Sequence, residues 1–569
     1  MKKTEIFYNN VIPKVLNSKV KISLTNEFQL LQERRISKGL EKGKNRFFFI
    51  FLLILSTVLF IIYNLYSITS IKKSQNYLTN SQNLPSKRGI IVDRNEKIIS
   101  ATISTKDLYL DPKKIIDKQK SIKSLSLIFP QKGKNYFKNI LNKKRYLLIE
   151  RHISLEKSNK IKAIGEPGLI FQVSKKRVYP HNNLFSHITG FLSKFEIPQS
   201  KLEKNFDEVL SKGLKLNLTV DVKIQNILYE EIQKGKDQFS AKAAAGILMN
   251  VNNGEILSML SLPDFNPNHP GKIKPFTESN LITNARYEMG STLKMFNAAM
   301  AFENNSISTE YLFDISEGYP LTKTKTVFDE FPMKEPVDFD TIFTKSSNVG
   351  SIKVLEKTGI KKQRIFFNLL GFNNQTKIEG LNSISNSLPS LKDWNDVASK
   401  TISYGYGLSI TPISLVTKFA SLVNGGHKIE PKIIKEQKVI KKQIIKNETS
   451  KKINKLLHKI VENGTGKQAK VKGISIGGKT GTANKSKNKT GYFQDKIITS
   501  FIGTFPVENP KYLLFILYDE PNNIEKKYYG GNTAAPVFAK IIKRITPILK
   551  ISKENNLKDN YFLTKSSKN

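Results

Sequence analysis

One apolar stretch near the amino terminus constrains the fold more than any other feature of this chain. Residues 47–71 carry no charged side chain, and residues 47–63 are almost wholly apolar. A helix needs about 20 such residues to cross the hydrocarbon core of a bilayer. A cleaved signal peptide would have a shorter apolar core and a small-x-small motif, which is not evident after Ile62. The sequence therefore predicts one transmembrane helix over residues 47–71, rather than a signal peptide or a buried core helix.

The charges before this stretch predict its orientation. Basic residues outnumber acids there and include Arg34, Arg35, Lys38, Lys42, Lys44 and Arg46. Because cytoplasmic flanks are rich in Lys and Arg, we expect residues 1–46 to form a cytoplasmic tail and everything after the helix to be exported. The sequence thus predicts an exported protein tethered to a membrane.

The composition excludes several function classes. The net charge of +44 would suit a polyanion partner, but the lysines are spread through every segment and no nucleic-acid-binding motif accompanies them. We therefore expect no nucleic-acid binding. The chain has no cysteine, which rules out disulfides and thiolate chemistry. Its six histidines form no ligand motif, so we expect neither a metal site nor a metal cofactor.

The middle of the chain predicts an antiparallel sheet. Apolar runs at residues 243–249 and 255–262 flank Asn252-Asn253-Gly254, a strong hairpin signal. A helix is expected before them, from Val222 to about Lys234, and a closing helix from Ala534 to about Leu549. Residues 497–505 and 512–518 predict two more strands. A sheet of this kind combined with helices gives an α+β fold rather than a parallel doubly wound one.

Ser291 and Lys294 are the first candidate catalytic residues. The run from Thr292 to Phe302 lacks Pro and Gly and has helical apolar spacing, and Gly290 permits a sharp turn into it. Residues three apart share a helix face, so the Lys294 amine could reach the Ser291 hydroxyl. A serine needs a base to become a nucleophile, and a lysine is a base only when neutral. By itself, however, Ser-x-x-Lys is most often an ordinary helix start.

Two later clusters carry further polar groups. Ser346 and Asn348 are separated by one residue. They lie in residues 297–400, a segment whose pattern is mostly helical. A strand predicted over Val471 to Gly477 runs into Lys479-Thr480-Gly481-Thr482, which could offer a cation and hydroxyls to a carboxylate. Lys489-Thr490-Gly491 repeats these letters in a polar loop, and we interpret it as part of a hairpin connection.

Ser-x-x-Lys, Ser-x-Asn and Lys-Thr-Gly in this order, spread over about 190 residues, form the motif set of penicillin-binding proteins and class A β-lactamases. The chain resembles class B penicillin-binding proteins over about residues 47–550. Further segments that carry the resemblance are Arg88 to Asn95, Arg177 to Pro180, Leu202 to Asp207 and Gly254 to Leu257. Residues 403–408, 478–483 and 530–538 look most like the septal, FtsI-type members. Two departures are Met289, where proline is usual, and Glu96, where glycine is frequent.

The resemblance implies a penicillin-binding/β-lactamase-like transpeptidase domain, an antiparallel sheet flanked by helices plus an all-α subdomain. It would follow an elongated pedestal domain of the dimerisation type. We expect the pedestal at residues 72–230, the transpeptidase domain at 231–550 and a polar tail at 551–569. The enzyme would sit in a bacterial inner membrane with its catalytic domain in the periplasm.

The implied reaction is a D,D-transpeptidation of peptidoglycan stem peptides that end in D-Ala-D-Ala. Ser291 would be the nucleophile and Lys294 its base, kept neutral by burial and by the charge of Lys479. Ser346 would relay a proton and Asn348 would fix Lys294. Lys479, Thr480, Gly481 and Thr482 would bind the substrate carboxylate, which β-lactams imitate. The backbone N–H groups of Ser291 and Thr482 would form the oxyanion hole.

The implied partners are peptidoglycan, β-lactams, the membrane, an FtsW-type glycan polymerase and other division proteins. The alternatives are a side-wall elongation transpeptidase, a β-lactamase, and a non-catalytic division scaffold or β-lactam sensor. No cofactor is expected.

Overall fold

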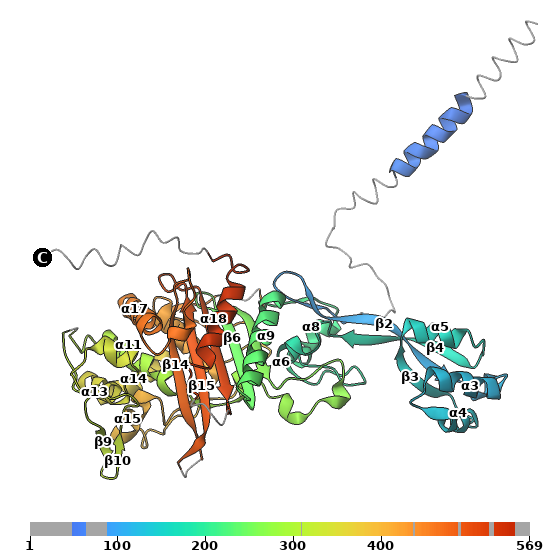
Figure 1. Ribbon diagram of the computed structural model, residues 1–569. Helices are drawn as coiled ribbons and strands as arrows, with labels where there is room; N and C mark the ends of the chain where they lie inside the picture. The colour runs from blue at the N-terminus through green and yellow to red at the C-terminus, as the bar shows by residue number, and fades with distance from the viewer. Residues whose placement is uncertain are drawn as a thin grey trace, which may run out of the picture. The chain divides into compact units, whose positions relative to one another are not determined.

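The computed structural model describes residues 48–63, 88–308, 310–435, 439–487, 491–522 and 528–551 (Figure 1). The chain divides into two compact units, Met1–Pro85 and Ser86–Asn569. The described part of the first unit is a helix over residues 48–63, whose large apolar side chains are 41–69% exposed. Of the helices in the described ranges, none has both the length and the apolar character needed to span a bilayer. Outside the described residues lie the predicted cytoplasmic tail, residues 47 and 64–71 of the predicted span, residues 72–87 of the predicted pedestal and residues 552–569.

The second unit begins with a sheet of five strands in the order β3-β2-β1-β5, with β4 pairing β2. The strands are β1 (Ile91–Val92), β2 (Ile98–Leu110), β3 (Leu147–Ile153), β4 (Leu169–Val178) and β5 (Leu216–Asn217). The helices and 3₁₀ turns of this part are η1 (Pro112–Lys114), α3 (Lys118–Ile128), α4 (Gly133–Leu141), α5 (Leu155–Lys162), η2 (Asn182–Phe185), α6 (Ser186–Thr189), α7 (Lys201–Asn205) and α8 (Asp207–Ser211).

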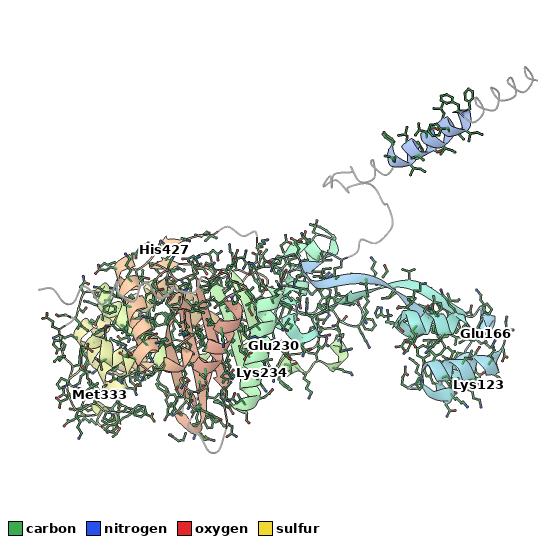
Figure 2. The ribbon with its side chains drawn as sticks, turned by 45° about the horizontal axis from the view of Figure 1, so that its top comes forward. Lys123, Glu166, Glu230, Lys234, Met333 and His427 are labelled. Carbon is green, nitrogen blue, oxygen red and sulfur yellow. The ribbon has the colours of Figure 1, made fainter. Side chains whose placement is uncertain are left out.

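A small separate core lies at one end of β2 and β4. There α3, α4 and α5 pack around buried side chains such as Phe129 and Phe137. Glu166, labelled in Figure 2, accepts hydrogen bonds from the backbone N–H groups of Ile116 and Asp117 at 2.8 and 2.9 Å. Asp117 in turn caps α3. These contacts satisfy backbone donors at the start of a helix, where no helical partner exists.

The three amino-terminal segments that were singled out in the sequence meet at one buried carboxylate, Glu203. Arg177 donates to Glu203 at 2.7 Å and to the carbonyl of Gly89 at 2.7 Å. Arg88 donates to the other oxygen of Glu203 at 2.8 Å. The side chains of Arg177 and Glu203 are 1% and 0% exposed, so neither charge could be left unpaired without a large penalty. The network fixes these three segments to one another.

The turn after β1 explains one departure from the family pattern. Glu96 stands where a glycine is frequent, and its φ of 63° lies in the left-handed region that favours glycine. Its carboxylate pairs with Lys215 at 2.7 Å on the surface. A residue with a side chain therefore adopts a glycine-like backbone conformation at this turn.

The larger part of the second unit is organised on an antiparallel sheet with the strand order β14-β15-β16-β6-β7. The strands are β6 (Ala243–Asn250), β7 (Ile256–Leu262), β14 (Gly477–Ser486), β15 (Tyr492–Phe505) and β16 (Tyr512–Asp519). The predicted hairpin at Asn252-Asn253-Gly254 connects β6 to β7, and the α+β prediction is confirmed. The central strands are buried on both faces, because helices cover both sides of the sheet.

One face of this sheet packs against α9 (Val222–Gln238) and α18 (Ala534–Ile545), as Figure 1 shows. Glu230 of α9, labelled in Figure 2, pairs with Arg544 of α18 at 2.7 Å. The other face is covered by the mostly helical region between β7 and β14. Burial of each large apolar side chain contributes about 1.5–3 kcal/mol, so the two cores hold the layers together.

The region between β7 and β14 contains many short elements. They are η3 (Pro270–Lys272), η4 (Pro275–Thr277), α10 (Leu281–Asn284), β8 (Tyr287–Glu288), η5 (Gly290–Leu293), α11 (Lys294–Glu303), β9 (Tyr319–Thr322), β10 (Lys325–Val327), α12 (Phe339–Thr344), α13 (Asn348–Thr358), α14 (Ile360–Leu370), α15 (Asp396–Tyr404), β11 (Ser409–Ile410), α16 (Pro412–Val423), β12 (His427–Lys428), β13 (Lys442–Gln443), α17 (Asn447–Asn463) and η6 (Lys467–Ala469). Residues 297–400 are thus helical as predicted, but the β9–β10 hairpin and a long loop after α14 interrupt them.

One predicted strand is wrong. Val471 to Gly477 does not form a strand, because Gly473 adopts a φ of 77° and folds the chain into a turn that pairs Val471 with Ile474. Instead β14 begins at Gly477 and contains the whole Lys479–Thr482 segment. Lys489 and Thr490 lie outside the described residues, between β14 and β15.

Candidate active site

Ser291 lies in a tight turn between the sheet and the helical region. The turn is the 3₁₀ segment η5, which runs directly into α11. Gly290 has a φ of 54°, and a Cβ atom there would lie 2.3 Å from the carbonyl oxygen of Thr482. Only glycine allows such an approach. Gly290 therefore allows the turn that carries Ser291 to pack directly against β14.

Lys294 is the first residue of α11 and is fully buried. Its amine donates to the carbonyl and the hydroxyl of Ser346, the latter at 3.3 Å, and to Oδ1 of Asn348 at 2.7 Å. Within the described residues no hydrogen bond joins the Ser291 hydroxyl to this amine. A base and a nucleophile are often farther apart in a free enzyme than during the reaction, so this does not exclude the pair.

Ser346 joins the two lysines. Its hydroxyl lies 3.3 Å from the Lys294 amine and accepts a hydrogen bond from the Lys479 amine at 2.9 Å. Ser346 has a φ of 63°, a left-handed conformation that is unfavourable for a serine. Such strain persists only where surrounding contacts impose it, and it gathers at functional sites.

Asp329 holds the three residues that follow Ser346, and no pattern in the sequence singled it out. It follows β10, accepts hydrogen bonds from the backbone N–H groups of Asn348 and Val349 and accepts another from the Ser347 hydroxyl. Ser347 caps α13 by accepting from the N–H of Gly350 at 2.7 Å. The carboxylate therefore holds the loop that carries Ser346 and Asn348. A single aspartate about 17 residues before Ser346 has no recognisable spacing, so only the structure identifies it.

The Lys479–Thr482 segment forms the opposite wall of the site. Gly481 faces the nucleophile turn, since a Cβ atom there would lie 2.8 Å from the Met289 carbonyl oxygen. The Lys479 amine reaches the Ser346 hydroxyl at 2.9 Å and lies 3.5 Å from the Thr480 hydroxyl. The Thr480 hydroxyl donates to Thr465 at 3.0 Å, and the Thr482 hydroxyl accepts from the N–H of Gly530 at 3.0 Å. The Thr482 hydroxyl can therefore donate its own proton to a ligand.

The two buried lysines disfavour each other's charge. Burial lowers the pKa of Lys294 to about 7, and the negative charge of Asp329 opposes this shift. Burial also lowers the pKa of Lys479, and the charge of Lys294 lowers it further. The sequence interpretation expected burial and Lys479 together to keep Lys294 neutral. In the structure, burial is the main cause of the lowered pKa of Lys294. The repulsion between the two amines lowers the pKa of Lys479 instead.

The structure brings every predicted site residue into this one place. Ser291, Lys294, Ser346 and Asn348 come from η5, α11 and the loop before α13, while Lys479, Thr480, Gly481 and Thr482 come from β14. The arrangement provides a hydroxyl nucleophile on a tight turn, two amines with lowered pKa values and a strand that faces them. It can therefore support acyl transfer to and from Ser291.

Replacement of Asp329 by asparagine is expected to slow reaction at Ser291 by about 10- to 100-fold, because an amide pairs less well than a carboxylate with three converging donors. The loss of its charge should also lower the pKa of Lys294, since Asp329 favours the ammonium form. The acid limb of the rate profile should therefore move to lower pH. Stopped-flow acylation with a chromogenic β-lactam across the pH range measures both effects.

Asp338→Asn is the matched control, since Asp338 caps α12 in the same manner without touching the Ser346 loop. Because asparagine caps a helix about as well as aspartate, it should change the stability little and leave the acylation rate within about twofold. Equal acylation rates in the wild type and Asp329→Asn would contradict the role assigned to Asp329.

Comparison with known proteins is consistent with this geometry. A family model described as the penicillin binding protein transpeptidase domain matches residues 244–543, and one described as the penicillin-binding protein dimerisation domain matches residues 83–217. The probable peptidoglycan D,D-transpeptidase FtsI of Caulobacter vibrioides is 30% identical over 501 residues, covering 84% of each chain. Stage V sporulation protein D of Bacillus subtilis is 28% identical over 541 residues, covering 84% of this chain and 81% of its own.

Among solved structures, the chain is similar in fold to the crystal structure of penicillin-binding protein 3 of Mycobacterium tuberculosis complexed with aztreonam. The TM-score is 0.67 at 20% sequence identity, and the match covers 83% of this chain and 98% of the other. At this identity the likeness concerns the fold alone.

Proposed function

Because the chain belongs to the class B penicillin-binding proteins and is a peptidoglycan D,D-transpeptidase, we propose that it cross-links stem peptides at the division septum through an acyl-enzyme on Ser291. The observation that carries the proposed chemistry is the Ser346 hydroxyl, which lies within hydrogen-bonding distance of both Lys294 and Lys479. This hydroxyl links Lys294 and Lys479, which are far apart in the sequence, into one path along which a proton can move.

Acylation begins with the donor peptide. The Ser291 oxygen attacks the carbonyl of the penultimate D-Ala while the neutral Lys294 amine takes the hydroxyl proton. The tetrahedral intermediate then breaks its C–N bond, and the departing D-Ala nitrogen receives a proton through the Ser346 hydroxyl. Asn348 holds the Lys294 amine at 2.7 Å throughout. General-base work of this kind contributes about 10²–10⁴ in rate.

The residues of β14 bind the substrate. Lys479 and the hydroxyls of Thr480 and Thr482 bind the terminal carboxylate of the donor. Gly481, where a Cβ atom would lie 2.8 Å from the Met289 carbonyl oxygen, lets the strand pack against the nucleophile turn. The backbone N–H groups of Ser291 and Thr482 stabilise the oxyanion, each by roughly 3–4 kcal/mol. A β-lactam presents a carboxylate and an acyl carbon in the same way.

Substrate binding also prepares the base. A carboxylate beside Lys479 favours the ammonium form of that lysine, which offsets the pKa lowering caused by burial. The resulting positive charge disfavours a second ammonium at Lys294, because both amines contact the same Ser346 hydroxyl. The base is therefore neutral when the donor is in place.

The septal role rests on relatives whose names indicate different functions. One is named FtsI and another is a sporulation protein, so side-wall elongation remains the second candidate. We assign residues 72–230 to the pedestal and residues 231–550 to the transpeptidase domain. Class B penicillin-binding proteins are membrane-anchored cell-wall enzymes, and residues 47–71 are proposed as the single anchor of this chain. An FtsW-type glycan polymerase and other division proteins are the proposed membrane partners.

A fluorescent fusion of the full chain in dividing cells tests the septal role. A band at midcell that appears before constriction is expected, and depletion should give filaments rather than spheres. Fluorescence along the side wall, with rounding on depletion, would instead assign the protein to elongation. If an inactive Ser291→Ala fusion restores division, the protein acts as a scaffold.

A further inference from the structure

Glu288 is a second carboxylate at the nucleophile turn, three residues before Ser291. It ends the short strand β8, which pairs with β11. Its Oε1 atom accepts hydrogen bonds from the N–H of Gly407 at 3.0 Å and from the hydroxyl of Tyr492 at 3.2 Å. One side chain thus touches the turn, the loop after α15 and β15.

The other oxygen of this carboxylate has no such partner. Oε2 of Glu288 is buried and accepts no hydrogen bond from the described residues. A buried carboxylate oxygen without a donor is costly, and a cation is the group that would satisfy it best. Burial raises the pKa of Glu288, and the hydrogen bonds from Tyr492 and Gly407 oppose this shift.

Aromatic rings surround the carboxylate. Tyr406 and Tyr492 pack edge to face with ring centroids 5.1 Å apart, and Tyr404 lies 5.9 Å from Tyr406. The negative charge of Glu288 contributes to raised pKa values of all three phenols, so all three lie near it. Tyrosine faces attract cations, and aromatic rings combined with a carboxylate form the usual recognition site for an alkylammonium group.

This cluster is attached directly to the reacting residues. The N–H of Gly290 donates to the carbonyl of Gly405 at 3.2 Å, and the N–H of Asn484 on β14 donates to the Tyr406 hydroxyl at 3.3 Å. A Cβ atom on Gly405 would lie 2.0 Å from the Gly290 carbonyl oxygen. The tyrosine cluster therefore contacts the backbone of the nucleophile turn and of β14 beyond Thr482, at a different part of the strand from Lys479.

The second half of the reaction needs a group of matching chemistry. The acyl-enzyme is resolved by a primary amine of a neighbouring stem peptide, and such an amine is mainly an ammonium ion at neutral pH. We propose that Glu288, framed by Tyr406 and Tyr492, binds this ammonium group and so forms the acceptor subsite. The inference rests on the acyl-enzyme at Ser291, which penicillin labelling reports independently.

The bound ammonium ion gives one proton to the Glu288 carboxylate and becomes a neutral amine. The nitrogen lone pair then attacks the ester carbon, a C–N bond forms and the bond from that carbon to the Ser291 oxygen breaks. The proton that the nitrogen loses passes through Lys294 to the Ser291 oxygen. The carboxylic acid of Glu288 afterwards releases its proton to water.

The test uses the full chain in detergent with a thioester donor that acylates Ser291. Two acceptors compete with water: D-alanine, which is an ammonium ion at neutral pH, and hydroxylamine, which is largely neutral. In Glu288→Gln the ratio of aminolysis to hydrolysis should fall about tenfold or more with D-alanine. With hydroxylamine it should change by less than about twofold, because no charge has to be recognised. Labelling by fluorescent penicillin should persist.

Glu520→Gln is the matched control. Glu520 is also partly buried and follows β16, but it pairs with Lys485 at 2.7 Å instead of facing the tyrosines. Its ratio with D-alanine should equal that of the wild type. An unchanged D-alanine ratio in Glu288→Gln, or equal losses with both acceptors, would overturn the proposal.

A second variant decides the matter if Glu288→Gln loses penicillin labelling altogether. Glu288→Asp keeps the charge on a shorter side chain. It should label and keep a D-alanine to hydroxylamine preference within about threefold of the wild type. A labelled Glu288→Asp protein without that preference would refute the acceptor subsite.

Discussion

Ser291→Ala is expected to abolish covalent labelling by fluorescent penicillin and to reduce transpeptidation by at least about 10⁴-fold. The hydroxyls of Ser346 and Thr480 already take part in hydrogen bonds with Lys479 and Thr465, so Ser291 is the hydroxyl expected to form the ester. The measurement is in-gel fluorescence of the purified full chain after incubation with the labelled penicillin. The methyl group of alanine fits the turn, so the melting temperature should stay near that of the wild type.

Ser308→Ala serves as the control for this prediction, since Ser308 is an exposed serine in the segment that follows α11. It should label like the wild type. A covalent band from Ser291→Ala that survives boiling in detergent would show that another residue is the nucleophile.

Lys294→Met is expected to slow acylation by about 10²–10⁴-fold, nearly as much as loss of the serine, because it removes the base while keeping a side chain of similar length. It also leaves the Ser346 carbonyl and Asn348 Oδ1 without a donor. Time-resolved acylation by a chromogenic β-lactam measures the rate constant. An acylation rate within about tenfold of the wild type would exclude Lys294 as the base.

The same measurement in the wild type should reveal the titration of this base. The pKa of Lys294 is about 7, well below the ordinary value of 10.5 for a lysine. Its neutral form therefore grows as pH rises through 7, and the acylation rate should rise with it to a plateau. Below that pH the ammonium form dominates and cannot accept the serine proton. A rate that does not change across this range would contradict the assignment.

Lys418→Met is the matched control for Lys294→Met. Lys418 is also buried, with a pKa lowered to about 8, but its amine donates to Thr376 at 2.6 Å within the helical region. Its replacement should affect stability and leave the pH profile of acylation unchanged. Comparing the two variants separates the effect of losing a buried lysine in general from the effect of losing the lysine beside Ser291.

The sequence predicted the local elements of the site well, because their signals are local. Gly290 before an apolar helical run indicated the nucleophile turn. Lys479 and the threonines beside small residues indicated a segment that offers a cation and hydroxyls to a carboxylate. The start of β14 was placed wrongly, since an alternating apolar pattern does not reveal that Gly473 turns the chain. At this point the turn at Gly473 decides the backbone conformation, although the apolar residues alternate as in a strand.

Groups that act through long-range contacts could not be predicted. Asp329, Glu288 and Tyr492 carry no motif spacing, and their partners lie 18, 119 and 204 residues away along the chain in the hydrogen bonds that define them. The Glu203 network likewise joins Arg88 and Arg177 across 115 and 26 residues. A pattern search sees residue types at fixed spacings and has no information about which distant carboxylate reaches a given amine.

The sequence by itself determined the chemistry that this protein can perform: a serine, two lysines, a Ser-x-Asn pair and a Lys-Thr-Gly strand in a fixed order. Only the tertiary structure decided how these groups work together. It buried Lys294 and Lys479 completely, placed one serine hydroxyl between them and brought Asp329 to the segment that follows this serine. The physical reason is that a lysine becomes a base through desolvation and through its neighbours' charges, and both are properties of the folded chain.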